Sequence, residues 1–274
     1  MLALKADLHI HSHYSDGSDS VERVIEKAKK AGLSAISFVD HDTVDGWEEK
    51  QTLAAAAGIE AIPGIEISAY DFKRNRKVHV LGYNFRPDAP SITALCEELL
   101  MRRHRHSIWQ MEKIKAAGFE LDMEAVIRSA KPSRTVYKQH IMKGLTDAPF
   151  GSEEYQLLYR SLFKGKGVAA GDIEYLDAFD AVRAIAADGG LAVVAHPGQL
   201  DSYDLVPELV KMDLGGIERN HFDHSAQDHG KVEKLAREYG LVMTGGTDYH
   251  GVYGKTITIG ELCSPENVNN FNLL

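Results

Sequence analysis

Residues 7–16 of the chain read DLHIHSHYSD, a stretch that predicts both a strand and a metal site. Leucines alternate with polar residues up to position 8, which is typical of a short strand. Side chains two residues apart in an extended chain point to the same side, so His9 and His11 can hold one ion together. Asp16 follows in a Ser-Asp-Gly turn, which can bring its carboxylate to the same point. Taken alone, the stretch could instead be a surface strand end with chance histidines.

The composition fits one large α/β domain. The chain has 274 residues, 44% of them hydrophobic, which is enough for a full core and an insertion. It contains no apolar run near 20 residues and no basic-then-apolar leader, so we expect no membrane span and no signal peptide. Cys96 and Cys263 lie in no metal-type spacing and fit a reduced cytoplasmic setting. The net charge of −9 argues against broad nucleic-acid binding, although bound metal ions could still attract a small anionic substrate.

Helix and strand patterns alternate in the first third of the chain. Helices are expected over 20–31 and 46–57, and each is followed by a glycine. Strands are expected over 33–39, 59–67 and 77–83, each with a metal-competent residue at or near its end. This order predicts a barrel-like α/β fold, in which the carboxyl ends of the strands share one face with the active site.

Residues 86–170 interrupt this alternation. Strand signals are almost absent from them, and several basic residues occur there. We interpret 86–170 as a helical insertion, or lid, that covers the barrel mouth, with 1–85 and 171–274 forming the barrel. The helices of the insertion are expected over 91–117, 123–129, 135–145 and 152–163.

The alternation then resumes to the end of the chain. Three of the strands lead directly into polar clusters, which begin at His196, Asn220 and Gly245. Helices are expected over 177–187, 205–212 and 226–239, and strands over 190–195, 216–218, 241–244 and 256–259.

Nine histidines and acids recur at the expected strand ends. Any one of them could be a hydrogen-bonded core residue or a solvated carboxylate, but chance would have to place all nine at equivalent points. Imidazole and carboxylate ligands suit zinc, manganese or iron, and nine side chains suit two or three ions with Glu66 as a bridge. Such a site would be positive overall and would attract phosphate. The nine residues are His9, His11, Asp16, His41, Glu66, His79, His196, Asp248 and His250.

Six motifs in this chain resemble those of the PHP (polymerase and histidinol phosphatase) family, and they occur in the family's order. The resemblance implies a distorted seven-stranded β/α barrel with a trinuclear metal site. Within the family, the chain is most similar to the nucleoside 3′,5′-bisphosphate phosphatases and the RNase AM-type 5′–3′ exonucleases, although Ser133 and Thr135 depart from their Gly-Arg-Pro-His segment. The motifs are His9-x-His11, Ser15-Asp16-Gly17, Asp40-His41-Asp42, Pro63-Gly64-Ile65-Glu66, Ala195-His196-Pro197 and Gly246-Thr247-Asp248-Tyr249-His250-Gly251.

The resemblance also implies how the ligands divide among three divalent transition-metal ions. Glu66 would be shared by two of the ions. The ions would crowd the point of attack beside Asp248 and His250. The three sets are His9, His11, Glu66 and Asp248; Asp16, His41 and His250; and Glu66, His79 and His196.

Substrate contacts are expected from the insertion and from one barrel loop. The resemblance implies that Arg134 and Lys166 hold substrate phosphate, with a solvated face as the alternative for each. His221 and His224 are candidates to protonate a leaving oxygen or to touch phosphate, with a polar loop as the alternative.

Four other polar residues are expected to stay outside the reaction. His13 and Asp7 would orient metal ligands without binding metal themselves. His104 and His106 fit an exposed helix face.

The leading functional hypothesis is a metal-dependent phosphatase of small nucleotides such as a nucleoside 3′,5′-bisphosphate, with short oligonucleotides as further substrates. It requires no protein partner. Histidinol-phosphate phosphatase is an alternative, disfavoured by the cationic lid, and a non-catalytic metal-binding module is another. The sequence contains no recognisable nucleophile motif, so we expect direct attack by a metal-bridging hydroxide and no phosphoryl-enzyme.

Overall fold

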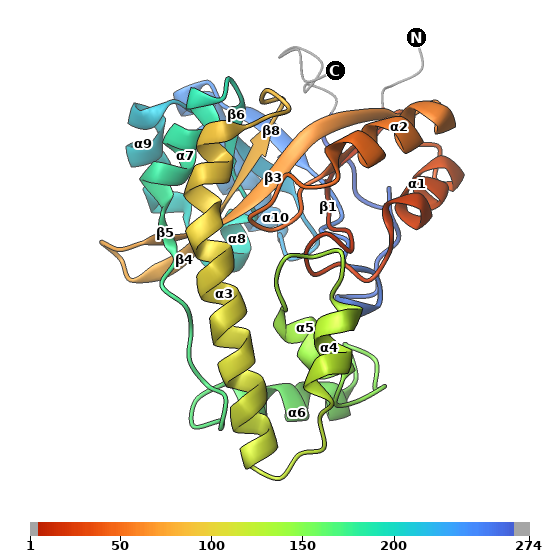
Figure 1. The fold of residues 1–274 in the computed structure, drawn as a ribbon. Coiled ribbons are helices and arrows are strands. Elements are labelled where there is room, and N and C mark those ends of the chain that lie inside the picture. The colour runs from red at the N-terminus through yellow and green to blue at the C-terminus, as the bar shows by residue number, and fades with distance from the viewer. Residues whose placement is uncertain (1–4, 266–274) are drawn as a thin grey trace.

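The strands form one mixed sheet that curves into a distorted half-barrel, with helices around it (Figure 1). Figure 1 shows a computed structural model, which describes residues 5–265. Seven strands follow one path, and a short eighth strand, β5, pairs with β3. The path runs through β1 (Ala6–Ile10), β2 (Ala35–Phe38), β3 (Glu60–Asp71), β4 (Arg76–Tyr83), β6 (Leu191–Val194), β7 (Leu214–Asn220) and β8 (Val242–Gly245), and β5 is Leu176–Asp177.

The two ends of the sheet approach each other beside the first histidines. A parallel bridge joins Ile10, at the end of β1, to Tyr249, just after β8. The amide of His11 donates to the carbonyl of Tyr249 at 2.9 Å. The expected distorted barrel is therefore confirmed, and its near-closure brings the first and last motifs of the chain together.

Strand β4 runs antiparallel to both of its neighbours, β3 and β6, whereas the other pairs along the path are parallel. Glu66 and His79 lie inside β3 and β4, which differs from the expectation that all nine residues recur at strand ends. His79 pairs with Ser68, two residues from Glu66. Residues two apart share a face of the sheet, so the antiparallel register places Glu66 and His79 on one face.

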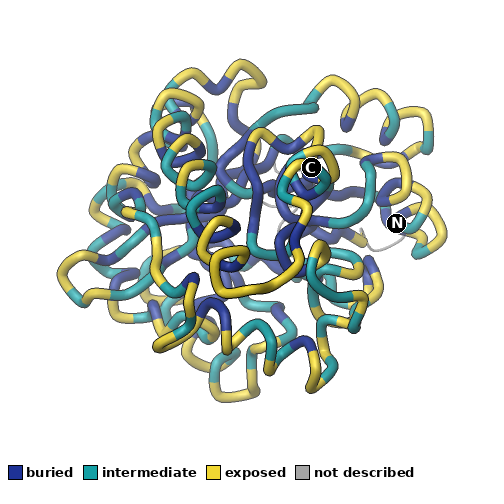
Figure 2. The backbone as a smooth tube through the Cα atoms, turned by 60° about the horizontal axis from the view of Figure 1, so that its bottom comes forward, coloured by how far each residue is buried: buried dark blue, intermediate teal, exposed yellow. Residues whose placement is uncertain are grey.

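The outer helices cover the sheet with apolar faces that the sequence pattern predicts. In α1, Val21, Val24, Ile25 and Ala28 are buried, and Ser20 caps the helix by accepting from the amide of Arg23. A smaller cluster, which includes Leu8, fills the inside of the sheet. Figure 2 shows buried segments at the centre and exposed ones around the rim. These helices are α1 (Val21–Lys30), α2 (Trp47–Ala57), α7 (Ala178–Ala187), α8 (Pro197–Leu200), α9 (Val206–Leu209) and α10 (Ala226–Tyr239).

Two expected elements differ in the structure. Residues 205–212 do not form one helix: α9 lies between 3₁₀ turns at Tyr203–Leu205 and Val210–Met212. The strand expected over 256–259 is absent, and the chain there makes bends and turns. One reason is that Gly260 has a φ of +79° and its amide bonds to the buried Asp7, so this segment folds back instead of extending.

The helical insertion has its own apolar core below the barrel (Figure 1). Its longest helix belongs to both parts: Ile92 and Leu99 pack into the barrel core, while Met111 and Ile114 pack into the insertion core. The domain limits at 86 and 170 therefore stay a prediction. The helices are α3 (Pro90–Ala116), α4 (Met123–Ser129), α5 (Lys138–Lys143) and α6 (Glu153–Phe163).

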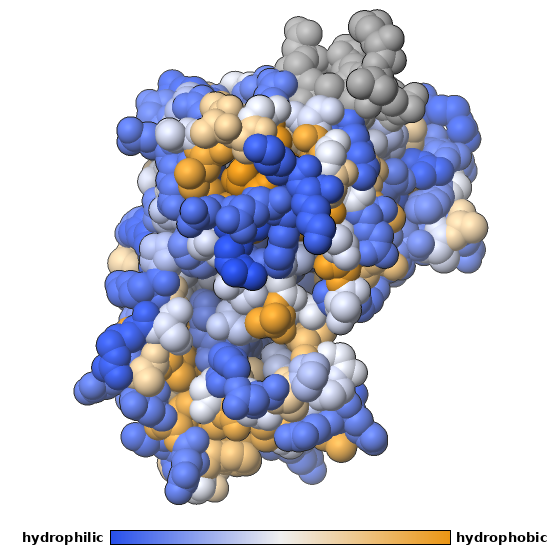
Figure 3. Space-filling view, turned by 90° about the vertical axis from the view of Figure 1, so that its right-hand side faces the viewer, coloured by the Kyte–Doolittle hydropathy of each residue, from blue (hydrophilic) through white to orange (hydrophobic). Residues whose placement is uncertain are grey.

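None of the helices within residues 5–265 combines the length and the apolar character that crossing a bilayer requires. On the face shown in Figure 3, most side chains are hydrophilic and the apolar ones form separate areas.

Candidate metal centre

The nine candidate ligands come together at the barrel mouth in three overlapping groups. Within each group, one ligand atom from every member lies within 4.8 Å of the others. Eight of the nine belong to these groups, and His196 joins them through Glu66, as described below. The groups are His9, His11, Glu66 and Asp248; His11, Asp16, His41 and His250; and His41, Glu66 and His79.

The first group surrounds a carboxylate pair. Nε2 of His11 lies 3.1 Å from Oε2 of Glu66 and 3.2 Å from Oδ1 of Asp248. Nε2 of His9 lies 3.4 Å from Oε2 of Glu66 and 3.2 Å from the same Asp248 oxygen. Two imidazoles thus face two carboxylates, as the i, i+2 spacing of His9 and His11 at the end of β1 predicts.

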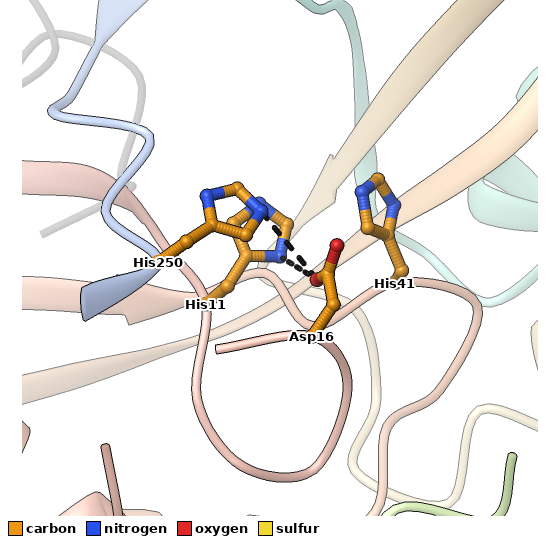
Figure 4. Close-up of side chains that lie close together, drawn as sticks. All are labelled: His11, Asp16, His41 and His250. Carbon is orange, nitrogen blue, oxygen red and sulfur yellow. Dashed lines mark ion pairs between the residues drawn. The ribbon is translucent and has the colours of Figure 1, made fainter. Parts of the chain in front are cut away.

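The second group gathers around Asp16 (Figure 4). Oδ1 of Asp16 lies 3.4 Å from Nε2 of His250 and 3.7 Å from Nδ1 of His11. The rings of His11 and His250 stack with centroids 4.0 Å apart, and His41 faces Asp16 from the other side. Residues from both ends of the chain therefore complete this group.

Glu66 connects the third group to the other two. Its Oε1 lies 2.7 Å from Nδ1 of His79 and 2.9 Å from Nε2 of His196. Its Oε2 lies 3.4 Å from Nδ1 of His41, besides the contacts to His9 and His11. Both oxygens of one buried carboxylate are thus surrounded by imidazoles, which is the arrangement that a bridging ligand requires.

Two candidate ligands have a strained backbone. Asp248 has a φ of +48° and His196 a φ of +22°, in a region that residues other than glycine rarely adopt. Asp7 stabilises this conformation of Asp248 through the preceding residue: its carboxylate accepts from the amide and the hydroxyl of Thr247 at 3.0 and 2.8 Å. Asp7 therefore orients the ligand turn, the role expected for it.

Glu218 also orients ligands, and sequence reasoning missed it. Its Oε1 lies 2.9 Å from Nδ1 of His9, and its Oε2 accepts from the amide of His196 at 2.7 Å. The available sequence signal was a glutamate directly after the apolar residues 214–217 of β7, and its full burial is seen only in the structure. Its contact fixes which nitrogen of His9 faces the group.

The charge state of the site fits divalent cations. Burial opposes charge on Glu66 and Asp248, yet the surrounding histidines hold the pKa of both carboxyls well below their usual range. Burial also opposes protonation of His11, but Asp248, Glu66 and Asp16 raise its pKa to about 10. In this structure, the positive charge of protonated histidines balances the negative charge of the carboxylates. Bound metal ions would supply that positive charge instead.

Unpartnered polar atoms support the same conclusion. Buried side-chain atoms should be hydrogen-bonded, and each exception needs a reason. Within residues 5–265, the atoms without a hydrogen-bond partner include both ring nitrogens of His11, Nδ1 of His41 and Oδ1 of Asp16. These are nitrogen and oxygen atoms of the kind that transition metals bind, and Nδ1 of His11 faces Oδ1 of Asp16 at 3.7 Å.

A cavity of about 390 Å³ opens beside these groups, between the barrel and the insertion. Asp16, His41 and His79 line its barrel side. The opposite wall carries cationic and aromatic side chains, among them Arg103, His106, Tyr137, Lys138, Tyr155 and Tyr159.

The structure places the predicted substrate residues differently from one another. Arg134 is outside the cavity: its guanidinium contacts both oxygens of Glu97 at 2.6 Å and borders a separate surface hollow. Lys166 is exposed and does not line this cavity. The predicted phosphate contacts of Arg134 and Lys166 are therefore not supported by their positions.

His221 and His224 lie behind the ligands. Nδ1 of His221 accepts from the amide of Asp223, so its Nε2 carries the proton and donates to Asp248 at 3.2 Å. His224 donates from Nδ1 to the carbonyl of Arg219 and accepts at Nε2 from the amide of Gly198. With both nitrogens engaged by backbone, His224 is not presented to a substrate, and its predicted proton transfer is not favoured.

His106 and His13 both lie outside the three ligand groups. His106 was expected on an exposed face but lines the cavity and stacks on Trp109. His13 packs edge-on against Tyr14 and is in none of the three ligand groups.

Comparison with known proteins agrees with this geometry. The profile of the PHP domain matches residues 7–186. An Eggerthella lenta protein named phosphoribosyl 1,2-cyclic phosphate 1,2-diphosphodiesterase is 50% identical over 254 residues, which cover 93% of this chain and 97% of that protein. A 3′,5′-nucleoside bisphosphate phosphatase from Chromobacterium violaceum is 28% identical over 271 residues, covering 94% of each chain. A solved structure of a candidate metal-dependent phosphoesterase from Bifidobacterium adolescentis has a TM-score of 0.88 at 25% identity, covering 98% of this chain and 95% of that one.

Proposed function

The chain belongs to the PHP domain family and is a metal-dependent phosphoesterase, and we propose that it hydrolyses a small ribose compound bearing two phosphate groups. The observation that carries the proposal is the shared Glu66, whose two oxygens link ligand groups that open onto a cavity of about 390 Å³. This volume suits a ligand of nucleotide size. The nine ligands would hold three ions, with manganese, zinc or iron all compatible with the donor atoms.

The reacting phosphate would lie where Asp16, His41 and His79 line the cavity. When bound there, the ions would polarise the phosphoryl oxygens and lower the pKa of water. The chain itself would position the ligands: Gln139 donates to Oδ2 of Asp16 at 2.8 Å, and the hydroxyl of Tyr137 donates to the carbonyl of His41 at 3.0 Å. These two contacts connect the insertion to the reacting end of the cavity.

Water, not a protein side chain, would attack the phosphorus. Two serines line the cavity, but Ser107 donates its hydroxyl to the carbonyl of Val136 at 2.6 Å, and Ser68 accepts from Arg103 at 2.9 Å. Within residues 5–265, neither hydroxyl donates to a histidine or a carboxylate that could remove its proton. One bond from the water oxygen to phosphorus would form, one ester bond would break, and the leaving oxygen would take up a proton.

The first candidate substrate is a five-membered cyclic phosphodiester on a phosphorylated ribose. This proposal rests on the relative that is 50% identical over almost its full length and is named for such a compound. The second candidate is a nucleoside 3′,5′-bisphosphate. The aromatic residues that line the cavity, Tyr137, Tyr155 and Tyr159, favour this alternative because they offer surfaces on which a base could stack.

A substrate panel tests the proposal. The protein is loaded with manganese or zinc and incubated with phosphoribosyl 1,2-cyclic phosphate, adenosine 3′,5′-bisphosphate, histidinol phosphate and p-nitrophenyl phosphate, and products are followed by phosphorus NMR. We expect one of the two ribose compounds to give the highest kcat/KM. Preference for histidinol phosphate, or turnover of none of the four with metal present, would contradict the proposal.

A further inference from the structure

The wall of the cavity that faces the ligands carries a lysine that lies near one acid of the cavity, Asp172, but forms no ion pair with it. Lys138, the first residue of α5, lines the cavity and makes no ion pair or hydrogen bond with any of residues 5–265. The aromatic face nearest its ammonium is that of Phe163, with the centroid at 5.9 Å. Such a group is costly inside a protein unless an anion accompanies it.

The other strongly basic side chains on this cavity are neutralised already. Arg103 donates to Asp42 at 2.6 Å, and Lys77 is paired with Asp172. Lys138 therefore provides the available positive charge among the described residues that line the cavity.

Lys138 lies at the edge of the cavity and is not fully solvated. The side chain is partly buried, and this burial lowers the pKa of its amine to about 8, with Asp172 opposing the shift and Lys77, Lys164 and Arg103 adding to it. A nearby phosphate would stabilise the charged ammonium and raise the pKa of Lys138 again. A lysine on an open helix face would show neither the burial nor the shift.

The position of α5 places Lys138 on the same cavity as the candidate metal ligands. Gln139, the next residue, donates to Asp16 among the metal ligands. The same cavity that contains Lys138 is lined by Asp16, His41 and His79. One small molecule can therefore contact the ligand groups and this ammonium together.

A second unpartnered group lies on the same wall. Nε2 of His106 is buried and has no hydrogen-bond partner within residues 5–265, while its ring stacks on Trp109. Burial keeps the pKa of His106 below its ordinary value, so the ring is neutral near pH 7. A neutral ring nitrogen suits a sugar hydroxyl, and it adds a polar contact next to the lysine.

We propose that Lys138 is a specificity-determining residue, whose ammonium binds the phosphate that is not hydrolysed. This inference rests on the proposed function, because it assumes a substrate with two phosphate groups. It assigns to Lys138 the contact that sequence reasoning gave to Arg134, which the structure turns toward Glu97 and away from the cavity.

The kinetic test compares two lysines of one helix. Lys138→Met removes the charge and keeps a side chain of similar length, and Lys143→Met is the control because Lys143 lies at the far end of α5, paired with Asp147 on the surface. For the preferred two-phosphate substrate, we expect Lys138→Met to lower kcat/KM by about 10- to 100-fold, mainly through KM. Hydrolysis of p-nitrophenyl phosphate should change by less than about threefold, and Lys143→Met should match the wild type on both substrates.

A binding test separates this inference from the proposed function. Ribose 5-phosphate and ribose are titrated into metal-loaded wild type and both variants by calorimetry, which needs no turnover. We expect ribose 5-phosphate to bind more tightly than ribose to the wild type and to lose about tenfold or more in Lys138→Met only. Equal binding by Lys138→Met and wild type, no preference for the phosphorylated sugar, or equal kinetic losses on both substrates would overturn the inference, whereas failure of the substrate panel alone would overturn the proposed function.

Discussion

Glu66 connects more of the site than any other single side chain described. Its two oxygens contact five histidines, and each of these contacts is between 2.7 and 3.4 Å. A carboxylate so surrounded can serve two ions at once, whereas an amide has one oxygen and no charge. Substitution of Glu66 should therefore reduce activity more than substitution of a ligand that belongs to one group.

Glu66→Gln should abolish most activity without unfolding the protein. We expect kcat to fall at least about 1,000-fold, because the variant loses the bridging charge while its shape is kept. The matched control is Glu60→Gln, at the exposed start of the same strand, which should retain wild-type activity. Circular dichroism checks the fold, and a loss of less than tenfold in Glu66→Gln would show that Glu66 does not bridge.

Asp7 is a stability determinant at the same scale. Its buried carboxylate accepts from four donors, namely the amides of His9, Thr247 and Gly260 and the hydroxyl of Thr247. Asp7→Asn keeps the volume but lacks one acceptor oxygen, so we expect a free energy of unfolding lower by about 2–3 kcal/mol in urea titrations. Asp180→Asn, on the exposed face of α7, should change it by less than about 0.5 kcal/mol. If Asp7→Asn were as stable as the wild type, the turn at Thr247 would not depend on the Asp7 carboxylate.

At the scale of elements, the antiparallel strand β4 brings the third group together. The apolar periodicity predicted α1, α4 and α10 closely, because each has a glycine or a cap at its ends and a single buried face. Strand direction was not readable from the same pattern. The expected strand over 256–259 was wrong because a period-2 pattern also fits a segment whose amides bond elsewhere, as that of Gly260 does.

The turn that carries Asp16 depends on Gly17. A Cβ at this position would lie 2.6 Å from the carbonyl oxygen of His11, which is backbone and cannot move aside cheaply. Gly17→Ala should therefore displace Asp16 and reduce metal content by about one ion per chain, measured by elemental analysis. Gly230→Ala is the control: it lies in α10 with open space around its Cβ, so it should keep all ions and gain up to about 1 kcal/mol of stability. Full metal content in Gly17→Ala would show that the turn tolerates the shift.

At the scale of the whole molecule, the cavity exists because a helical insertion faces a barrel mouth. The candidate metal ligands could be proposed from sequence, since the motifs place His and Asp residues on known strand and turn positions. Lys138 could not be distinguished from Arg134 in this way. Both are basic residues of the insertion, and only the packing of α5 against the barrel shows which of them lines the cavity.

The pH dependence of substrate preference follows from this arrangement. Lys138 has a folded-state pKa of about 8, so its ammonium is present below pH 8 and is lost as the pH rises through that value. We expect the ratio of kcat/KM for the two-phosphate substrate to that for p-nitrophenyl phosphate to fall above pH 8. The ratio cancels the pH dependence that the metal site gives to both substrates. In Lys138→Met, the ratio should be flat from pH 7 to pH 9.5, and a parallel fall in the variant would show that Lys138 does not cause the pH dependence.

The proposed hydrolysis depends on a cluster of transition-metal ions, which nine side chains of the barrel mouth would hold. The protein is purified with manganese or zinc, and gel filtration removes the unbound ions. Elemental analysis then gives the number of ions that remain bound per chain. We expect close to three ions per chain in the wild type and close to two in His79→Ala, whose side chain contacts Glu66 alone among the candidate carboxylates. One ion or fewer per wild-type chain, in protein that hydrolyses phosphate esters, would contradict this expectation.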